Sequence, residues 1–207
     1  MEKELQRIGL SFEILHSLSY KSGIDMSMKN SLSHFDKGEL MEDIRNCINY
    51  YHESRILDDT DADYRIKSMD SCIRKFDKYY PNREVERTFN DILGFRVLCD
   101  NYDVYLKPDL PEGIRIADMS KGKSNDDGYR GVHLYYQEDH RHYPVEIQVN
   151  TYYDRQFNNW THMYFYKKNY PSEIGRQLRE KYERGEIQSE IQFKEALDYV
   201  LSVSKKV

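Results

Sequence analysis

The sequence predicts an α+β fold in which a small mixed β-sheet is flanked by helices. Apolar residues recur at helical spacing in the first 80 residues and again after residue 152, which predicts helices at both ends of the chain. The middle of the chain instead holds short segments rich in β-branched and aromatic residues. No repeat, low-complexity tract or linker interrupts the chain, so residues 1–207 are expected to form one domain.

Helices are expected first along the chain. The apolar spacing predicts a helix over residues 3–18 and then a polar loop over 20–34. Further apolar stripes predict helices over residues 40–51 and 69–80, and Ser68 stands where the N-cap of the latter helix would be. These helices precede the sheet.

Four strands are then expected, at residues 92–99, 114–119, 131–137 and 143–149. The last two alternate apolar and polar residues, and a hairpin between them would bring His133, Glu146 and Gln148 to one polar face. Helical spacing resumes at Tyr153, and two more helices are expected over residues 172–184 and 187–200.

Composition narrows the class of protein. The net charge is -5, so the molecule as a whole is not a polyanion binder and any nucleic-acid contact needs a local basic patch. Three dispersed cysteines favour a reducing compartment over a disulfide framework or a zinc site. No apolar run approaches ~18 residues and no leader pattern opens the chain, so we expect a cytoplasmic protein without a membrane span.

Four short strings in the middle of the chain carry the candidate chemistry. They are RIKS (65–68), DILGFR (91–96), GYRGVH (128–133) and VEIQ (145–148). Together they supply two carboxylates for a metal, cations for phosphates and an aromatic ring for a base. A phosphoryl- or pyrophosphoryl-transfer site needs these parts.

Glu146 is the more informative of the two carboxylates, because acids are depleted in the middle of strands. A divalent metal shared with Asp91 would compensate its charge, and Mg²⁺ favours one or two carboxylates plus substrate phosphates. Two alternatives stay open: Asp91 as a cap, and Glu146 on the outer face of an edge strand. Arg96 shares a face with Asp91 only if the strand starts after Asp91 or if Gly94 forms a bulge.

Basic side chains near the 69–80 helix suit a polyphosphate. Arg65 and Lys67 flank its start and Lys75 lies about two turns further on, although a solvated basic face is the alternative. Gly128 allows a turn that would leave the ring of Tyr129 exposed for stacking on a base. His133 is either part of that site or a core histidine.

The strings resemble the synthetase domain of RelA/SpoT-type enzymes, especially the small single-domain alarmone synthetases, over roughly residues 65–168. Such enzymes move the β,γ-pyrophosphate of ATP onto a nucleotide 3′-hydroxyl. The resemblance implies that ATP is held by Arg65, Lys67, Ser68, Lys75 and Arg96. It implies Mg²⁺ at Asp91 and Glu146, with Glu146 also a candidate base. It places the acceptor against Tyr129, Arg130, His133 and Gln148.

Departures from the family pattern fall on the acceptor side. The family's N-P-K-P-N-G-Y loop is SNDDGY here, so Asn125 replaces a lysine and two acids follow it, and Asn150 replaces an arginine after E-I-Q. An acceptor without a 5′-polyphosphate is therefore expected. This resembles the toxic branch of the family, which modifies the 3′ CCA end of tRNA and is held in check by an antitoxin protein.

A basic run downstream is a possible tRNA contact through phosphates, or else an ordinary charged helix. The run comprises Lys167, Lys168, Arg176, Arg179, Lys181 and Arg184, of which the first four are the candidate contacts. Two other functions stay open. One is the synthesis of (p)ppGpp or ppApp with GDP, GTP or an adenosine nucleotide as acceptor, and the other is a pseudo-enzyme that binds nucleotide and regulates a partner.

Overall fold

The structure is a computed structural model that describes residues 2–7, 9–58, 60–106, 111–165, 168 and 170–204. The chain divides into two compact units that interleave along the sequence. The first unit comprises Met1–Val97, Asp103–Ile116 and His133–Gln148. The second comprises Leu98–Tyr102, Ala117–Val132 and Val149–Val207. A single synthetase domain over 1–207 stays a prediction.

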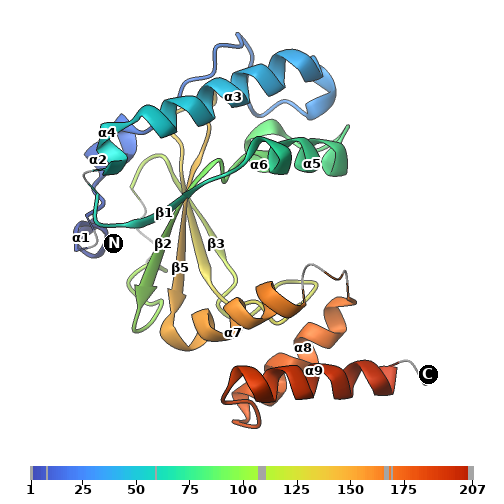
Figure 1. Ribbon diagram of the computed structural model, residues 1–207. Helices are drawn as coiled ribbons and strands as arrows, with labels where there is room; N and C mark the ends of the chain where they lie inside the picture. Colours follow the sequence, from blue (N-terminus) through green and yellow to red (C-terminus); the bar gives the residue numbers. More distant parts are fainter. Residues whose placement is uncertain are drawn as a thin grey trace. The chain divides into compact units, whose positions relative to one another are not determined.

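A five-stranded mixed sheet has the order β1-β2-β5-β4-β3, which confirms the predicted α+β class (Figure 1). Its strands are β1 (Asp63–Ile66), β2 (Leu93–Cys99), β3 (Ile114–Asp118), β4 (Val132–Tyr136) and β5 (Val145–Thr151). The last four begin and end within two residues of the predicted strands. The prediction of only four strands was wrong, because β1 has no fully buried residue and therefore no apolar pattern.

The sheet separates an apolar face from a polar one. Alternate residues of β2 are buried, namely Leu93, Phe95 and Val97. Gly94 and Arg96 point to the other face, and the antiparallel β1 places Arg65 opposite Gly94 and Asp63 opposite Arg96. The regular pairing at Gly94 rules out a bulge there, so the sheet presents a polar face on which functional side chains can gather.

The first unit carries the helices before the sheet. They are α1 (Glu2–Gln6), α2 (Phe12–Ser17), α3 (Lys37–Glu53), α4 (Arg55–Asp58), α5 (Met69–Tyr79) and α6 (Val85–Thr88), with a 3₁₀ helix at Leu32–His34. One helix over 3–18 was a wrong prediction, because Gly9 adopts φ +75° and Ser11 caps a new helix by accepting a hydrogen bond from the Ile14 amide at 3.2 Å. α3 packs against α5 and β1 (Figure 1).

α5 begins directly after Ser68, as predicted. The Ser68 hydroxyl lies 2.9 Å from the Ser71 hydroxyl and makes no hydrogen bond to the backbone of the first turn. The predicted cap position is therefore confirmed, whereas its side-chain bond is not formed. This helix carries Lys75 toward the site.

The second unit contains α7 (Tyr152–Tyr164), α8 (Ser172–Glu183) and α9 (Glu190–Ser204), which pack on one another. Their core is aromatic: the ring centroids of Phe157 and Phe193 are 5.7 Å apart and those of Trp160 and Tyr182 are 5.8 Å apart. None of the helices in the described residues has the length and apolar character that a transmembrane span requires.

Candidate active site

Asp91 lies just before β2, between two ammonium groups of the first unit. Lys67 Nζ donates to Asp91 Oδ2, and Lys75 Nζ donates to Asp91 Oδ1 at 2.9 Å. The backbone amide of Lys67 donates to the Ile92 carbonyl at 2.8 Å, which extends the β1–β2 ladder and fixes Lys67 beside Asp91. The strand β2 therefore starts after Asp91. The Asp91 carboxylate pairs with the two lysines and does not cap the strand.

The charges in this cluster stabilise one another. Burial by itself would raise the pKa of Asp91, but Lys75 and Lys67 outweigh it and hold that pKa below its usual value. Burial lowers the pKa of Lys67, which is 8% exposed, and the repulsion from Lys75 adds to this while Asp91 opposes it. Two ammonium groups and one carboxylate leave one net positive charge, which suits a phosphate.

Two arginines of the predicted ATP site lie on the polar face of the sheet. Arg65 of β1 is exposed, and no carboxylate pairs with it within the described part of the chain. Arg96 Nη1 lies 3.6 Å from Asp63 Oδ2 and its side chain is 37% exposed. Ion pairs of such exposure contribute little, so both guanidinium groups can turn to an anionic ligand.

Glu146 lies on β5, the central strand of the sheet, and is 5% exposed. The alternative of an edge strand is therefore wrong. Glu146 Oε1 accepts a hydrogen bond from the Tyr135 hydroxyl at 3.1 Å and lies 3.0 Å from His133 Nδ1, and Gln148 Nε2 donates to Oε2 at 2.7 Å. The predicted polar face of His133, Glu146 and Gln148 is confirmed.

Glu146 fits the ligand chemistry of Mg²⁺, whereas both oxygens of Asp91 pair with lysines. Among the described residues, no lysine or arginine pairs with the buried Glu146, so its charge lacks a full cationic partner. The neighbouring Gly94 leaves the Glu146 carboxylate uncovered, because a Cβ at position 94 would lie 3.5 Å from Glu146 Oε2. No three metal-ligating side chains gather in the described residues, but Mg²⁺ needs only one or two carboxylates with substrate phosphates. Mg²⁺ itself stays a prediction.

Tyr135 is a site residue that the sequence reasoning missed. Its ring is 8% exposed, and burial together with the negative charge of Glu146 raises the pKa of its hydroxyl well above the usual value. The hydroxyl therefore stays protonated and donates to Glu146. Its place two residues after His133, on the same face of β4, was the signal available in the sequence.

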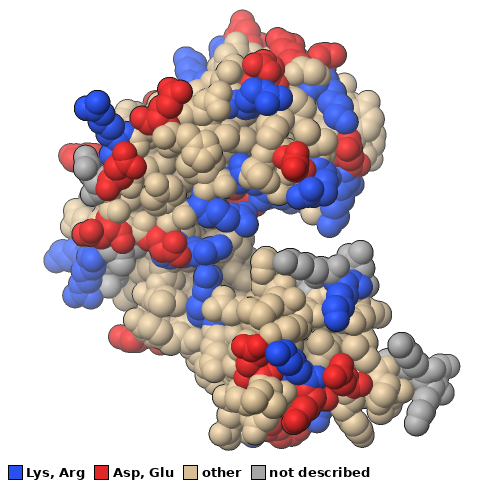
Figure 2. All heavy atoms as spheres, in the orientation of Figure 1, with Lys and Arg blue, Asp and Glu red and all other residues tan. Residues whose placement is uncertain are grey.

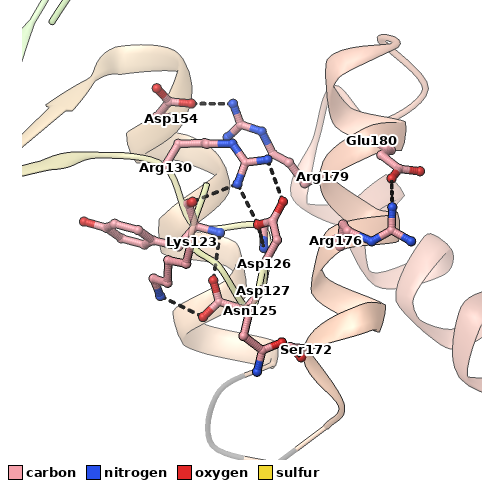
Figure 3. A network of polar contacts seen from close by, with 12 residues as sticks. Lys123, Asn125, Asp126, Asp127, Arg130, Asp154, Ser172, Arg176, Arg179 and Glu180 are labelled. Atoms are coloured by element: carbon pink, nitrogen blue, oxygen red, sulfur yellow. Dashed lines mark hydrogen bonds and ion pairs between the residues drawn. The ribbon is translucent and has the colours of Figure 1, made fainter. Parts of the chain in front are cut away.

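The acceptor-side loop, residues 121–131, belongs to the second unit and pairs its own charges (Figure 3). Arg130 Nη1 and Nη2 donate to the two carboxylate oxygens of Asp126 at 2.7 and 3.0 Å. Lys123 Nζ donates to Asp127 Oδ2 at 2.8 Å and lies 4.8 Å from the centroid of the Tyr129 ring. Tyr129 is partly buried rather than exposed as predicted, and the Lys123 ammonium lies over its ring.

The same loop is held tightly against α8. Gly128 adopts φ +85°, and a Cβ at this position would lie 2.4 Å from the Gly175 carbonyl oxygen. The Ser172 hydroxyl at the start of α8 donates to Asn125 Oδ1 at 2.7 Å. The asparagine that replaces the family's lysine therefore anchors the loop (Figure 3).

Asn150, the other position that departs from the family pattern, contacts the backbone of the same loop. Asn150 Nδ2 donates to the Arg130 carbonyl at 2.9 Å, and Asn158 Nδ2 donates to the same oxygen at 2.7 Å. Asn150 stands where the family pattern has an arginine. It therefore fixes the loop backbone, and no basic side chain occupies that position.

The predicted basic run is largely paired. Arg179 is 4% exposed and donates to Asp154 and Glu183, so its prediction as a tRNA contact was wrong. Arg176 is exposed but pairs with Glu173 and Glu180. Figure 2 shows basic and acidic side chains interspersed over the α8–α9 region. Lys168 is exposed, and Lys167 lies outside the described residues.

One known protein family matches the middle of the chain. The family model of the region found in RelA/SpoT proteins matches residues 64–171, just over half of the chain. No curated protein matches the sequence. The small alarmone synthetase 2 from Bacillus subtilis is similar at 19% identity, with 84% of this chain and 100% of that chain covered and a TM-score of 0.43.

Two further solved structures are similar. The small alarmone synthetase 1 from Bacillus subtilis bound to its product pppGpp has 21% identity, with 82% of this chain and 91% of that chain covered and a TM-score of 0.42. A GTP pyrophosphokinase family protein from Streptococcus pneumoniae has 19% identity, with 81% of this chain and 86% of that chain covered and a TM-score of 0.38.

The segment matched by the family model contains all four strings, from Arg65 to Gln148. It includes both carboxylates and the lysines that surround Asp91. The prediction of a pyrophosphokinase is confirmed at the level of the family. The chain belongs to the RelA/SpoT family of pyrophosphokinases.

Proposed function

We propose that this pyrophosphokinase transfers the β,γ-pyrophosphate of ATP to the 3′-hydroxyl at the CCA end of tRNA. Such a modification blocks aminoacylation and therefore translation, so the proposal includes a toxin's role and a separate antitoxin protein that holds the enzyme in check. The observation that carries it is the pairing of Lys123 with Asp127 and of Arg130 with Asp126.

These are the lysine and the arginine nearest to Tyr129 in the sequence. A free GDP or GTP brings two or three 5′-phosphates, which need unpaired donors such as lysine or arginine. The bidentate Arg130–Asp126 pair is largely buried, because the side chains are 10% and 22% exposed. Separating it would leave a poorly hydrated charge without a partner, which is costly. A tRNA 3′ end has no polyphosphate, so its binding does not require Arg130 to separate from Asp126.

The first unit supplies the donor side of the proposed reaction. Lys67 and Lys75 bind the phosphates of ATP in exchange for part of their contact with Asp91, and Arg65 and Arg96 add charge from the polar face of the sheet. Asp91 and Glu146 are the residues that would hold Mg²⁺, whose contribution is to neutralise phosphate charge.

Glu146 is the candidate base for the attacking 3′-hydroxyl. Tyr135 and Gln148 each donate a hydrogen bond to one of its oxygens, which fixes the orientation of the carboxylate. General-base catalysis of this kind contributes about 10²- to 10⁴-fold. The remaining acceleration comes from positioning and charge neutralisation, which dominate phosphoryl-group transfer.

The direct test uses ATP labelled at the γ-phosphate with Mg²⁺ and offers tRNA, GDP and GTP separately. We expect label on tRNA, lost when the 3′-terminal nucleotide is removed. Label on guanosine nucleotides alone would overturn the proposal in favour of the alarmone synthetase. Absence of label from every acceptor would point to the pseudo-enzyme instead.

Variants test whether the paired loop determines the acceptor. The double variant Asp126→Asn/Asp127→Asn releases Arg130 and Lys123, and we expect its use of GDP relative to tRNA to rise about tenfold. Asp118→Asn is the matched control, since this exposed acid at the end of β3 accepts side-chain hydrogen bonds from Ser120 alone among the described residues. An unchanged GDP-to-tRNA ratio in the double variant would contradict the reasoning.

A further inference from the structure

A basic surface lies on the exposed side of α5 and on the loop after it, in the first unit. It consists of Arg74, Lys78 and Arg83, and all three side chains are exposed. Within the described residues no carboxylate pairs with any of them, including that of Asp70 one turn before Arg74. Figure 2 shows basic side chains gathered along the edge of the α5–α6 region. Because the whole molecule carries a net charge of -5, this α5 basic surface is a local excess of positive charge.

The acids beside the α5 basic surface are neutralised by other cations. Asp77 precedes Lys78 in the sequence, but its Oδ1 accepts from Lys37 Nζ of α3 at 2.6 Å. Glu84 follows Arg83, but its Oε2 accepts from Arg87 Nε of α6 at 3.1 Å. The three cations of the surface therefore keep their charge available for an external anion.

The loop end of the surface is held in place by contacts on both sides. The Arg83 guanidinium lies 4.2 Å from the centroid of the Tyr79 ring, and Lys78 Nζ lies 5.2 Å from the same centroid. The Arg83 carbonyl accepts from the Leu32 amide at 2.9 Å, and the Arg83 amide donates to the Tyr79 carbonyl at 3.3 Å. Cations ordered in this way lose little conformational entropy when they bind an anion.

The arrangement of the cations suits an extended polyanion. Arg74 and Lys78 are four residues apart on one face of α5, which separates them by about 6 Å along the helix axis. Cations spread along an exposed face can contact successive phosphates of one nucleic-acid strand, whereas a single small anion needs donors that converge on it. The same helix carries Lys75, the neighbour of Arg74, to Asp91, so the surface begins beside the proposed ATP site.

We propose that the α5 basic surface binds the phosphate backbone of the acceptor tRNA, outside its CCA end. The inference rests on the proposed function, because that function makes tRNA the acceptor. Arg176 and Arg179 of α8, the contacts predicted from the sequence, are paired with acids, and the α5 basic surface takes their place. Backbone contacts position a nucleic acid without reading its sequence, so this surface supplies affinity that all tRNAs share.

The test measures binding of two fluorescent probes, deacylated tRNA and the same tRNA trimmed of its CCA end, at about 50 to 200 mM KCl. We expect Arg74→Gln/Arg83→Gln to weaken the binding of both probes about tenfold. The slope of log affinity against log salt concentration should fall by about 1 for each lost phosphate contact. Binding of ATP, measured by calorimetry, should be unchanged.

Arg45→Gln/Lys194→Gln is the matched control, because it removes the same charge from exposed cations that pair with Glu42 and Glu190. It should bind both probes as the wild type does. Arg74→Lys/Arg83→Lys keeps both charges and should keep the salt dependence, which separates the loss of charge from a folding defect.

The outcomes distinguish this inference from the proposed function. Wild-type affinity for tRNA in Arg74→Gln/Arg83→Gln would overturn the inference, as would a wild-type protein that binds neither probe. Weaker ATP binding with unchanged tRNA binding would overturn it too and assign the cations to ATP. A tRNA that binds through this surface but never receives the pyrophosphate would overturn the proposed function alone, since the binding comparison needs no turnover.

Discussion

Replacing Gly175 with alanine should detach the acceptor-side loop from α8. A Cβ at Gly175 would lie 2.1 Å from the Asp127 carbonyl oxygen and 2.8 Å from its carbonyl carbon. Both are backbone atoms, so no side-chain rotation can relieve the overlap. Since non-bonded carbon contacts are most favourable at about 3.5–4.0 Å, the loop has to retreat by more than an ångström.

Two opposing effects decide the sign of the change in stability. Alanine favours a helix interior over glycine by about 1 kcal/mol. Overpacking of a closely packed position costs about 1–3 kcal/mol. The retreat also breaks the Ser172–Asn125 hydrogen bond, which contributes about 1 kcal/mol more. Overpacking and the lost hydrogen bond together outweigh the gain in helix propensity. We therefore expect the second unit to lose about 1–3 kcal/mol of unfolding free energy.

Urea unfolding followed by tryptophan fluorescence measures this loss, because the single tryptophan, Trp160, lies in the core of α7–α9. Gly23→Ala is the control: its Cβ would lie 3.4 Å from Asp43 Oδ1, an ordinary contact, so stability should be unchanged or slightly higher. In activity assays, Gly175→Ala should impair use of the acceptor and leave the KM for ATP unchanged. A Gly175→Ala protein as stable as the wild type would refute the reasoning from this contact.

Three other variants test the assigned roles. Glu146→Gln keeps an acceptor for the Tyr135 hydroxyl but removes the base, so kcat should fall about 10²- to 10⁴-fold. The circular-dichroism spectrum should be unchanged. Turnover close to that of the wild type would exclude Glu146 from the mechanism. Tyr129→Ala should raise the acceptor KM about 5- to 150-fold, because base stacking contributes about 1–3 kcal/mol, while ATP binding measured by calorimetry persists; loss of ATP binding would refute the acceptor assignment. Asp91→Asn should lose about 1–3 kcal/mol of unfolding free energy at pH 7, because Lys67 stays buried without its partner. The pKa of Asp91 is lowered in the folded state, so its contribution to stability is fully present above the usual value of 3.8 and is lost as pH falls below that value. Between pH 7 and 2, the unfolding free energy should therefore depend less on pH for Asp91→Asn than for the wild type. Equal dependence of the unfolding free energy on pH in the two proteins would contradict this.

Much of the fold could be predicted because its elements carry local patterns. Alternation in residues 143–149 predicted β5 and the polar face with Glu146, since side chains on a strand point to opposite faces in turn. β1 was missed because its four residues are all exposed or partly exposed. The helix over 3–18 was predicted as continuous because apolar spacing says nothing about the positive φ of Gly9.

The candidate site was predictable in its residues but not in its pairings. Arg179 sits in a charged stretch that is typical of a solvated helix, yet it is buried against Asp154, which lies 25 positions earlier. No local pattern reveals such a pair. The roles of Asn150 and Asn158, which both bond the Arg130 carbonyl, likewise depend on segments brought together by folding.

The interleaving of the two units limits how this enzyme can be dissected. The chain passes between the units at residues 97–98, 102–103, 116–117, 132–133 and 148–149. A truncation after Gln148 would remove α7–α9 but leave residues 98–102 and 117–132 attached without the segments they pack with. No single cut yields two self-sufficient fragments, so limited proteolysis at any one of these crossings should inactivate the whole protein rather than release a folded half.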